Sequence, residues 1–118
     1  MKKTKLFASL KTSLMRMKKI EDVTEHSNTL NYSIRNRTYK LGNFNAAILR
    51  FNDPNIPAYY TSVYSKHEQP EKFDEEDINM HYGKKELGGT LTLFGAKQMA
   101  KKYVAQQETH LRPQKDLQ

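Results

Sequence analysis

The strongest constraint on the fold is a stretch in which apolar side chains recur at every second position. Leu30, Tyr32 and Ile34 alternate with polar residues, as in a strand with one buried face. From Tyr39 onward the apolar residues stand at odd positions instead. A regular strand cannot move its apolar residues to the other face, so the sequence predicts a bulge or a turn near residues 36–37.

Two further strands are expected to complete a β-meander over residues 29–65. Gly42-Asn43 is a turn signal, and the stretch FNAAILRF after it has apolar residues in both phases. This pattern indicates a strand covered on both faces, with a short helix as the alternative. NDPN then predicts a tight turn before the Tyr-rich strand IPAYYTSVYS. We therefore expect an antiparallel meander of three or four strands.

Helical periodicity is expected near both ends of the chain. Residues 4–20 separate an apolar face from a basic face, which predicts an amphipathic helix. The apolar face consists of Leu6, Phe7, Leu10, Leu14, Met17 and Ile20. Residues 95–107 show a second helical pattern, preceded by a short strand over 87–94. The intervening residues 66–82 predict an acidic loop, and residues 108–118 a polar tail.

Together these elements predict one α+β domain over residues 1–118. Its small antiparallel sheet of about four strands would be covered by the N-terminal amphipathic basic helix and the C-terminal helix. A chain of 118 residues suits a single domain. At the second helix we expect a bulge at Gly88-Gly89 and a cap at Gly95, with Leu91 and Leu93 facing inward.

The net charge of +7 lies in the first twenty residues. Seven of the 20 Lys and Arg residues stand there without any acid, whereas the remaining chain holds 13 bases and 13 acids. An excess of one sign in one segment indicates a polyanionic partner or a targeting role.

This basic segment has four possible roles. A secretory signal is excluded because the apolar run LFASL is short and Lys11 interrupts it. A mitochondrial presequence has suitable amphipathicity, but the segment holds only one Arg. A membrane-surface helix would have no Trp and a single Phe. We favour a helix that packs its apolar face on the sheet, in a cytoplasmic protein, with a mitochondrial location as the alternative.

Composition and motifs argue against catalysis and metal binding. The absence of Cys excludes disulfides, thiolate nucleophiles and zinc sites with sulfur ligands. His26, His67, His81 and His110 are far apart and form no metal-binding motif. The chain has no nucleophile elbow and no Walker A loop, and no apolar run long enough to span a bilayer. We predict that the protein is not an enzyme and holds no cofactor.

Binding to nucleic acid is the function that the sequence favours. Basic side chains neutralise phosphates, and exposed aromatic rings stack on bases. We predict a small non-enzymatic nucleic-acid-binding accessory protein of the plasmid or phage type, in which a basic helix and an Arg/Tyr sheet face contact phosphates. The predicted contacts are Lys5, Lys11, Arg16, Lys18, Lys19, Arg35, Arg37, Lys40 and Tyr60. The sequence does not distinguish DNA from RNA, or a single strand from a double strand, as the ligand.

A protein–protein interaction module is the alternative function. The chain would then be a subunit of a larger assembly or an inhibitor, binding through a sheet edge or the acidic loop. The candidate residues in that loop are Glu71, Asp74, Glu75, Glu76 and Asp77.

Replacing Lys11, Arg16, Lys18 and Lys19 together with glutamine is expected to abolish nucleic-acid binding, because phosphate contacts supply most of such affinity. A gel-shift titration at several salt concentrations measures this loss. Binding that ignores salt, or that survives the substitutions, contradicts the prediction.

Overall fold

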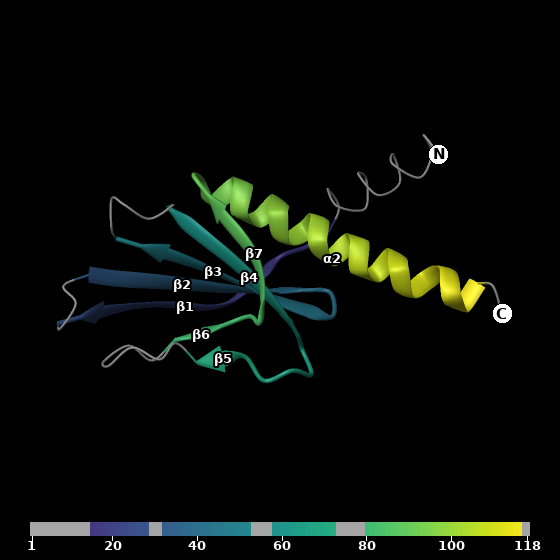
Figure 1. Ribbon diagram of the computed structural model, residues 1–118, viewed down its shortest axis with the longest axis horizontal. Coiled ribbons are helices and arrows are strands. Elements are labelled where there is room, and N and C mark those ends of the chain that lie inside the picture. The colour runs from purple at the N-terminus through teal and green to yellow at the C-terminus, as the bar shows by residue number, and fades with distance from the viewer. Residues whose placement is uncertain (1–14, 29–31, 53–57, 73–79, 117–118) are drawn as a thin grey trace.

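The computed structural model describes residues 15–28, 32–52, 58–72 and 80–116 of the chain. They form a five-stranded antiparallel sheet, in the order β1-β2-β3-β4-β7, with one C-terminal helix (Figure 1). The strands of this sheet are β1 (Lys18–Ser27), β2 (Tyr32–Leu41), β3 (Phe44–Phe51), β4 (Tyr59–Ser65) and β7 (Lys85–Thr90). A two-stranded ribbon consists of β5 (Glu71–Lys72) and β6 (His81–Tyr82), and the helix α2 spans Leu93–Asp116. The predicted α+β class is confirmed.

The predicted meander corresponds to β2, β3 and β4, and β1 adds a strand that the sequence did not reveal. The helix predicted over 4–20 lies outside the described residues up to residue 14. Residues 15–17 have no regular secondary structure and Lys18–Ile20 begin β1, so the predicted last turn of that helix is wrong. Most side chains of β1 are exposed because it is an edge strand. It therefore lacks the apolar alternation that marks a half-buried strand.

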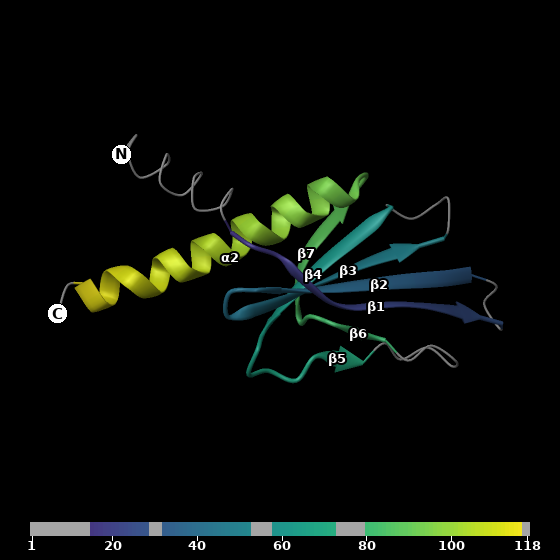
Figure 2. The same cartoon turned by 180° about the vertical axis from the view of Figure 1, so that it is seen from behind.

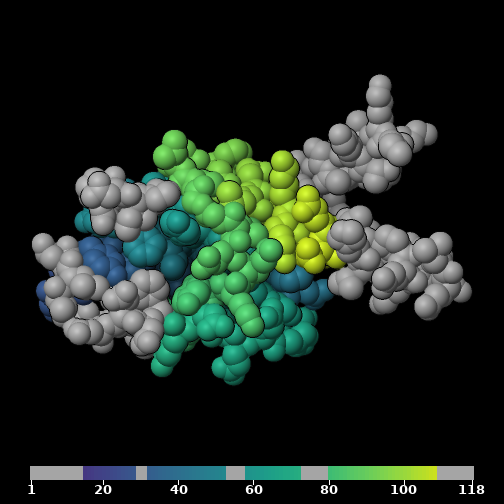
Figure 3. All heavy atoms as spheres, in the orientation of Figure 1, coloured from purple at the N-terminus to yellow at the C-terminus, as the bar shows by residue number. Residues whose placement is uncertain are grey.

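The two faces of the sheet are covered by different elements (Figures 1 and 2). We call the side under α2 the helix face, where Leu41, Ala46 and Val63 pack against Ala100 and Val104. The opposite side is the ribbon face, because β6 and the residue before it pack there. Its core consists of Ile34, Leu49 and Met80. In the space-filling view, β7 and the start of α2 (green) lie above the teal surface of β4 and β5 (Figure 3).

β2 runs without interruption, so the bulge predicted near residues 36–37 is wrong. Its register against β3 is continuous from Ile34 to Leu41. The change of phase arises because Asn36 and Thr38 are buried polar residues on the ribbon face. The Asn36 side-chain amide donates to the His81 carbonyl oxygen at 3.0 Å, and the Thr38 hydroxyl donates to Asn36 Oδ1 at 3.0 Å. These bonds satisfy polar groups that would otherwise be costly to bury.

The segment after β6 approaches β4 so closely that only glycine fits there. The Gly83 N–H donates to Ser62 Oγ at 2.8 Å. A β-carbon at Gly83 would overlap the Val63 carbonyl. This close contact fixes the path of the chain from the ribbon into β7.

The junction between β7 and α2 differs from the sequence prediction. A bulge lies at Leu87–Gly88, where the register with β4 shifts and Gly88 has φ 120°. Thr92 caps the helix by accepting the Gly95 N–H at 3.0 Å, so α2 begins two residues before the predicted start. Leu91 is 85% exposed, and its predicted inward position is wrong.

The C-terminal half of α2 projects beyond the sheet, and the helix continues into the predicted polar tail (Figure 1). Among the described residues, no helix is both long and apolar enough to cross a membrane.

Replacing Asn36 with alanine is expected to lower the free energy of unfolding by about 1–3 kcal/mol, because the Thr38 hydroxyl loses its acceptor and the His81 carbonyl its donor inside the core. Asn52→Ala, at an exposed asparagine, is the matched control. Urea denaturation measures both variants, and equal stabilities would contradict the structural role of Asn36.

Candidate nucleic-acid interface

α2 covers only part of the helix face. It packs on β3, β4 and β7, and the β1–β2 side of the sheet extends beyond it (Figures 1 and 2). Tyr39, Ile48 and Ala96 form the edge of the covered region, with Leu93 packed against them. Further along β2 from Tyr39, the next positions on this face are Arg37 and Arg35. The open part of the helix face is therefore basic.

Five basic residues from four elements gather here, and we call them the arginine patch. They are Lys19, Arg35, Arg37, Arg50 and Lys97. Alternation along β2 places both of its arginines on the same face as Tyr39. Arg50 lies directly opposite Arg35 on β3, and Lys19 lies opposite Tyr39 on β1. Lys97 reaches the patch from α2, with Nζ 5.0 Å from the centre of the Tyr39 ring.

Two tyrosines form an aromatic base beneath these cations. The guanidinium carbon of Arg50 lies 5.6 Å from the centre of the Tyr59 ring. Tyr39 holds Lys97 in the same way. A cation over an aromatic face is attracted by the ring quadrupole while its N–H groups stay available to another acceptor. The tyrosines thus orient two of the cations without neutralising them.

Asp22 is the acid that faces the patch. Its carboxylate accepts two hydrogen bonds from Arg35, at 2.9 and 2.8 Å, and one from Lys19 at 3.0 Å. Hydrogen bonds from Arg35 and then Lys19 hold the pKa of Asp22 well below its usual range. The carboxylate therefore stays ionised at any pH near neutrality. It fixes the orientation of Arg35 and occupies the N–H groups that a phosphate would use.

The two faces of the described strands β1–β4 carry different charge. The helix face holds Lys19, Arg35, Arg37 and Arg50 against Asp22. The ribbon face holds Lys18 and Lys40 against Glu21 and Glu25. The excess of positive charge on these strands therefore belongs to the helix face. A local excess of one sign raises the local concentration of an oppositely charged partner.

The structure unites only some of the predicted contacts. Arg35, Arg37 and Lys19 lie together on the helix face. Lys18 and Lys40 are paired on the ribbon face. Arg16 is exposed just before β1.

Tyr60 does not join the arginine patch. Tyr60 is 40% exposed on the ribbon face, with its ring 6.2 Å from that of Phe51. It therefore lies on the opposite side of the sheet from the arginines. Lys5 and Lys11 lie outside the described residues.

The contacts predicted from the sequence did not include Arg50, Lys97, Tyr59 or Asp22. Arg50 is the residue before the last in the stretch FNAAILRF, and its partner follows only from the hairpin register that a turn at Gly42-Asn43 imposes. The position of Lys97 over Tyr39 depends on how α2 docks. Asp22 had no strand assigned to it. A correct register for β1 would have found it opposite Arg37.

The acidic alternative can be located only in part. Glu71 is exposed in β5, on the ribbon. Asp74, Glu75, Glu76 and Asp77 lie outside the described residues. Within the described parts of the chain, no group of three or more His, Cys, Asp or Glu residues could hold a metal ion.

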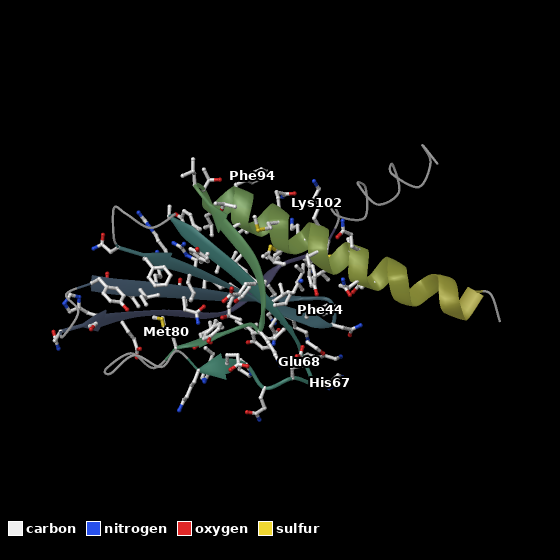
Figure 4. All side chains as sticks on the ribbon, in the orientation of Figure 1. Phe44, His67, Glu68, Met80, Phe94 and Lys102 are labelled. Carbon is white, nitrogen blue, oxygen red and sulfur yellow. The ribbon has the colours of Figure 1, made fainter. Side chains whose placement is uncertain are left out.

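A pocket of about 280 Å³ lies near the opposite end of the helix face from the arginines. It is lined by Phe44, Val63, Tyr64, Glu68, Lys84, Lys85 and Tyr103. Phe44 and Glu68 are both labelled in Figure 4, and the Phe44 and Tyr103 rings meet edge to face at 6.2 Å. Burial raises the pKa of the Tyr64 hydroxyl, which stays protonated. Glu68 accepts the Ser65 N–H at 2.8 Å, so its carboxylate stabilises the turn after β4.

Comparison with protein families, with curated proteins and with solved structures gave no match to this chain. We therefore infer the function from the residues themselves.

Replacing Asp22 with asparagine is expected to strengthen polyanion binding by about two- to fivefold, because Arg35 and Lys19 lose an exposed ion-pair partner. The salt concentration that elutes each variant from a heparin column measures the change. Glu71→Gln removes the same charge on the ribbon and is the matched control. Equal shifts for the two variants would show that only net charge matters.

Proposed function

We propose that this protein binds nucleic acid, as a non-enzymatic accessory protein, through the arginine patch on its helix face. The observation that carries the proposal is the convergence of Lys19, Arg35, Arg37, Arg50 and Lys97 around two tyrosines, with Asp22 as the acid among them. Phosphate contacts supply the larger part of non-specific affinity for nucleic acids.

The chemistry of arginine supports a phosphate ligand. A guanidinium presents N–H groups in a planar fork that matches two phosphate oxygens. Arg35 already makes such a two-bond contact with the Asp22 carboxylate, with its side chain 40% exposed. A carboxylate resembles a phosphate in its paired oxygens, so the observed pair shows the geometry in which Arg35 can receive an anion.

The spacing of the cations also suits a chain of phosphates. Directly opposed residues on neighbouring strands lie about 5 Å apart, and alternate residues along one strand about 7 Å apart. Arg35, Arg37 and Arg50 follow these spacings. They form a row of charges rather than one concentrated site. Such a row matches the successive phosphates of a linear polyanion.

Residues 15–17, which follow the basic N-terminal segment in the sequence, lie close to this surface. Met15 and Met17 pack against the core beneath α2, and Met17 also contacts the cluster that contains Tyr39. Arg16 lies between them with its side chain exposed. We propose that the lysines of the segment extend the phosphate contacts that begin at the arginine patch.

The double substitution Arg35→Gln and Arg50→Gln is expected to weaken binding at least tenfold at about 0.1 M salt. Each lost phosphate contact also lowers the slope of log affinity against log salt by about 0.7–0.9. Fluorescence anisotropy with a labelled 30-nucleotide strand and its duplex, over a series of salt concentrations, measures both quantities.

The matched control is Lys72→Gln with Lys84→Gln, which removes the same charge from exposed residues away from the arginine patch. Thermal unfolding verifies that all variants are folded. If the control weakens binding as much as the arginine variant, the protein attracts nucleic acid by net charge alone and the proposed interface is wrong.

A nuclease experiment distinguishes nucleic-acid binding from the alternative function, binding to a protein partner. A complex isolated from an extract on the tagged full chain should disappear after nuclease treatment. A complex that persists favours an interaction module that uses a sheet edge, at β1 or β7, or the ribbon that carries Glu71.

A further inference from the structure

The two most exposed large apolar side chains among the described residues lie at the start of α2. Leu91 is 85% exposed in the turn before α2, and Phe94 is 72% exposed in its first turn (Figure 4). Burying either side chain against a partner would be favourable.

Helical geometry shows which way Phe94 lies. At 100° per residue, Phe94, Lys97 and Lys101 occupy one flank of α2. Lys97 reaches over the Tyr39 ring on β2, so this flank borders the open part of the helix face. Leu93 packs onto Tyr39 and Ile48 beneath it. The aromatic ring therefore stands on the side of the helix next to the arginines.

The surface that results is a step. The sheet carries Arg35, Arg37 and Arg50 at its base, and α2, about 10 Å in diameter, rises beside them. Cations lie at the base and on the flank of the step, and Phe94 lies higher, near the start of the helix. A ligand that uses both parts must be anionic along its length, must offer flat apolar groups, and must bend within about one helix diameter.

We propose that the nucleic acid bound at this surface is single-stranded, with phosphates on the arginine patch and a base stacked on Phe94. This inference rests on the proposed function and adds the form of the ligand. Stacking of bases on exposed aromatic rings beside a basic groove is how single strands are bound without sequence preference. A duplex keeps its base faces inside and has a persistence length of about 50 nm, so following the step would cost it bending energy without offering a base to Phe94.

A lipid surface is the competing partner for exposed apolar residues flanked by lysines. The geometry disfavours it, because Arg35 and Arg37 lie at the base of the step, where a planar bilayer that touches Phe94 would not reach them. Vesicle binding is nevertheless one arm of the test.

The test uses the full chain and a labelled 20-nucleotide thymidine strand, compared with a duplex of the same length. Wild type is expected to bind the single strand at least tenfold more tightly than the duplex. Phe94→Ala should weaken single-strand binding by about five- to hundredfold, the range for loss of one stacked base. Duplex binding should change by less than twofold.

Phe94→Trp provides a second readout, because the chain has no other Trp. Its fluorescence should be quenched by the single strand, and its affinity should equal or exceed that of wild type. Tyr60→Ala, at an exposed tyrosine on the ribbon face, is the control and should leave single-strand affinity unchanged.

Three results would overturn the inference. If Phe94→Ala binds the single strand as wild type does while the Arg35 and Arg50 variants lose affinity, the proposed function stands and stacking at Phe94 is wrong. Equal or tighter duplex binding refutes the strand preference. If no oligonucleotide binds, but vesicles with phosphatidylserine bind wild type and not Phe94→Ala, the surface is a membrane contact and the proposed function fails as well.

Discussion

The antiparallel register of β2, which is continuous against β3 and shifts against β1 only between Lys19 and Glu21, is the constraint on which the rest of this structure depends. It places Arg35, Arg37 and Tyr39 on one face and Ile34, Asn36 and Thr38 on the other. A slip of one residue would exchange these two sets. The arginines would then be buried beneath the ribbon, and the polar core residues would lie beside α2.

The polar residues of β2 keep this register because they are bonded across the ribbon face. Asn36 reaches the His81 carbonyl, and Thr38 reaches Asn36 in turn. A hydrogen bond inside a core contributes modestly to stability, but a buried group without a partner is costly. Any register that moved Asn36 from His81 would lose this bond. The buried polar pair therefore specifies one alignment, and the arginine patch on the far side of β2 follows from it.

The sequence predicted the parts of the fold that local residue patterns determine. The predictions were wrong where contacts between distant parts of the chain determine the structure. The meander and the α+β class follow from alternation and from turn residues near Gly42 and Pro54. β1 was missed because an edge strand with both faces largely exposed has no apolar period. The bulge predicted near Asn36 was an error of the same kind. A polar residue was expected to face solvent, whereas the hydrogen bond to the His81 carbonyl stabilises Asn36 in the core. Leu91 was placed inward because it alternates with Leu93, yet the strand ends at Thr90 and the alternation no longer applies.

For the candidate site, the sequence supplied the residue types but not their arrangement. Arg35 and Arg37 were recognised from charge and alternation, whereas Tyr60 was assigned to their platform although it lies on the ribbon face. Arg50, Lys97 and Phe94 join the surface only through pairing of β3 and docking of α2, which no local pattern encodes.

An NMR titration that follows the side-chain Nε–Hε signals of the arginines tests most directly whether the arginine patch binds nucleic acid. We expect the signals of Arg35, Arg37 and Arg50 to shift as an oligonucleotide is added and to return as salt is raised. Binding at the arginine patch is contradicted if these three signals stay unchanged while the ring signals of Tyr60 and its neighbours on the ribbon face move.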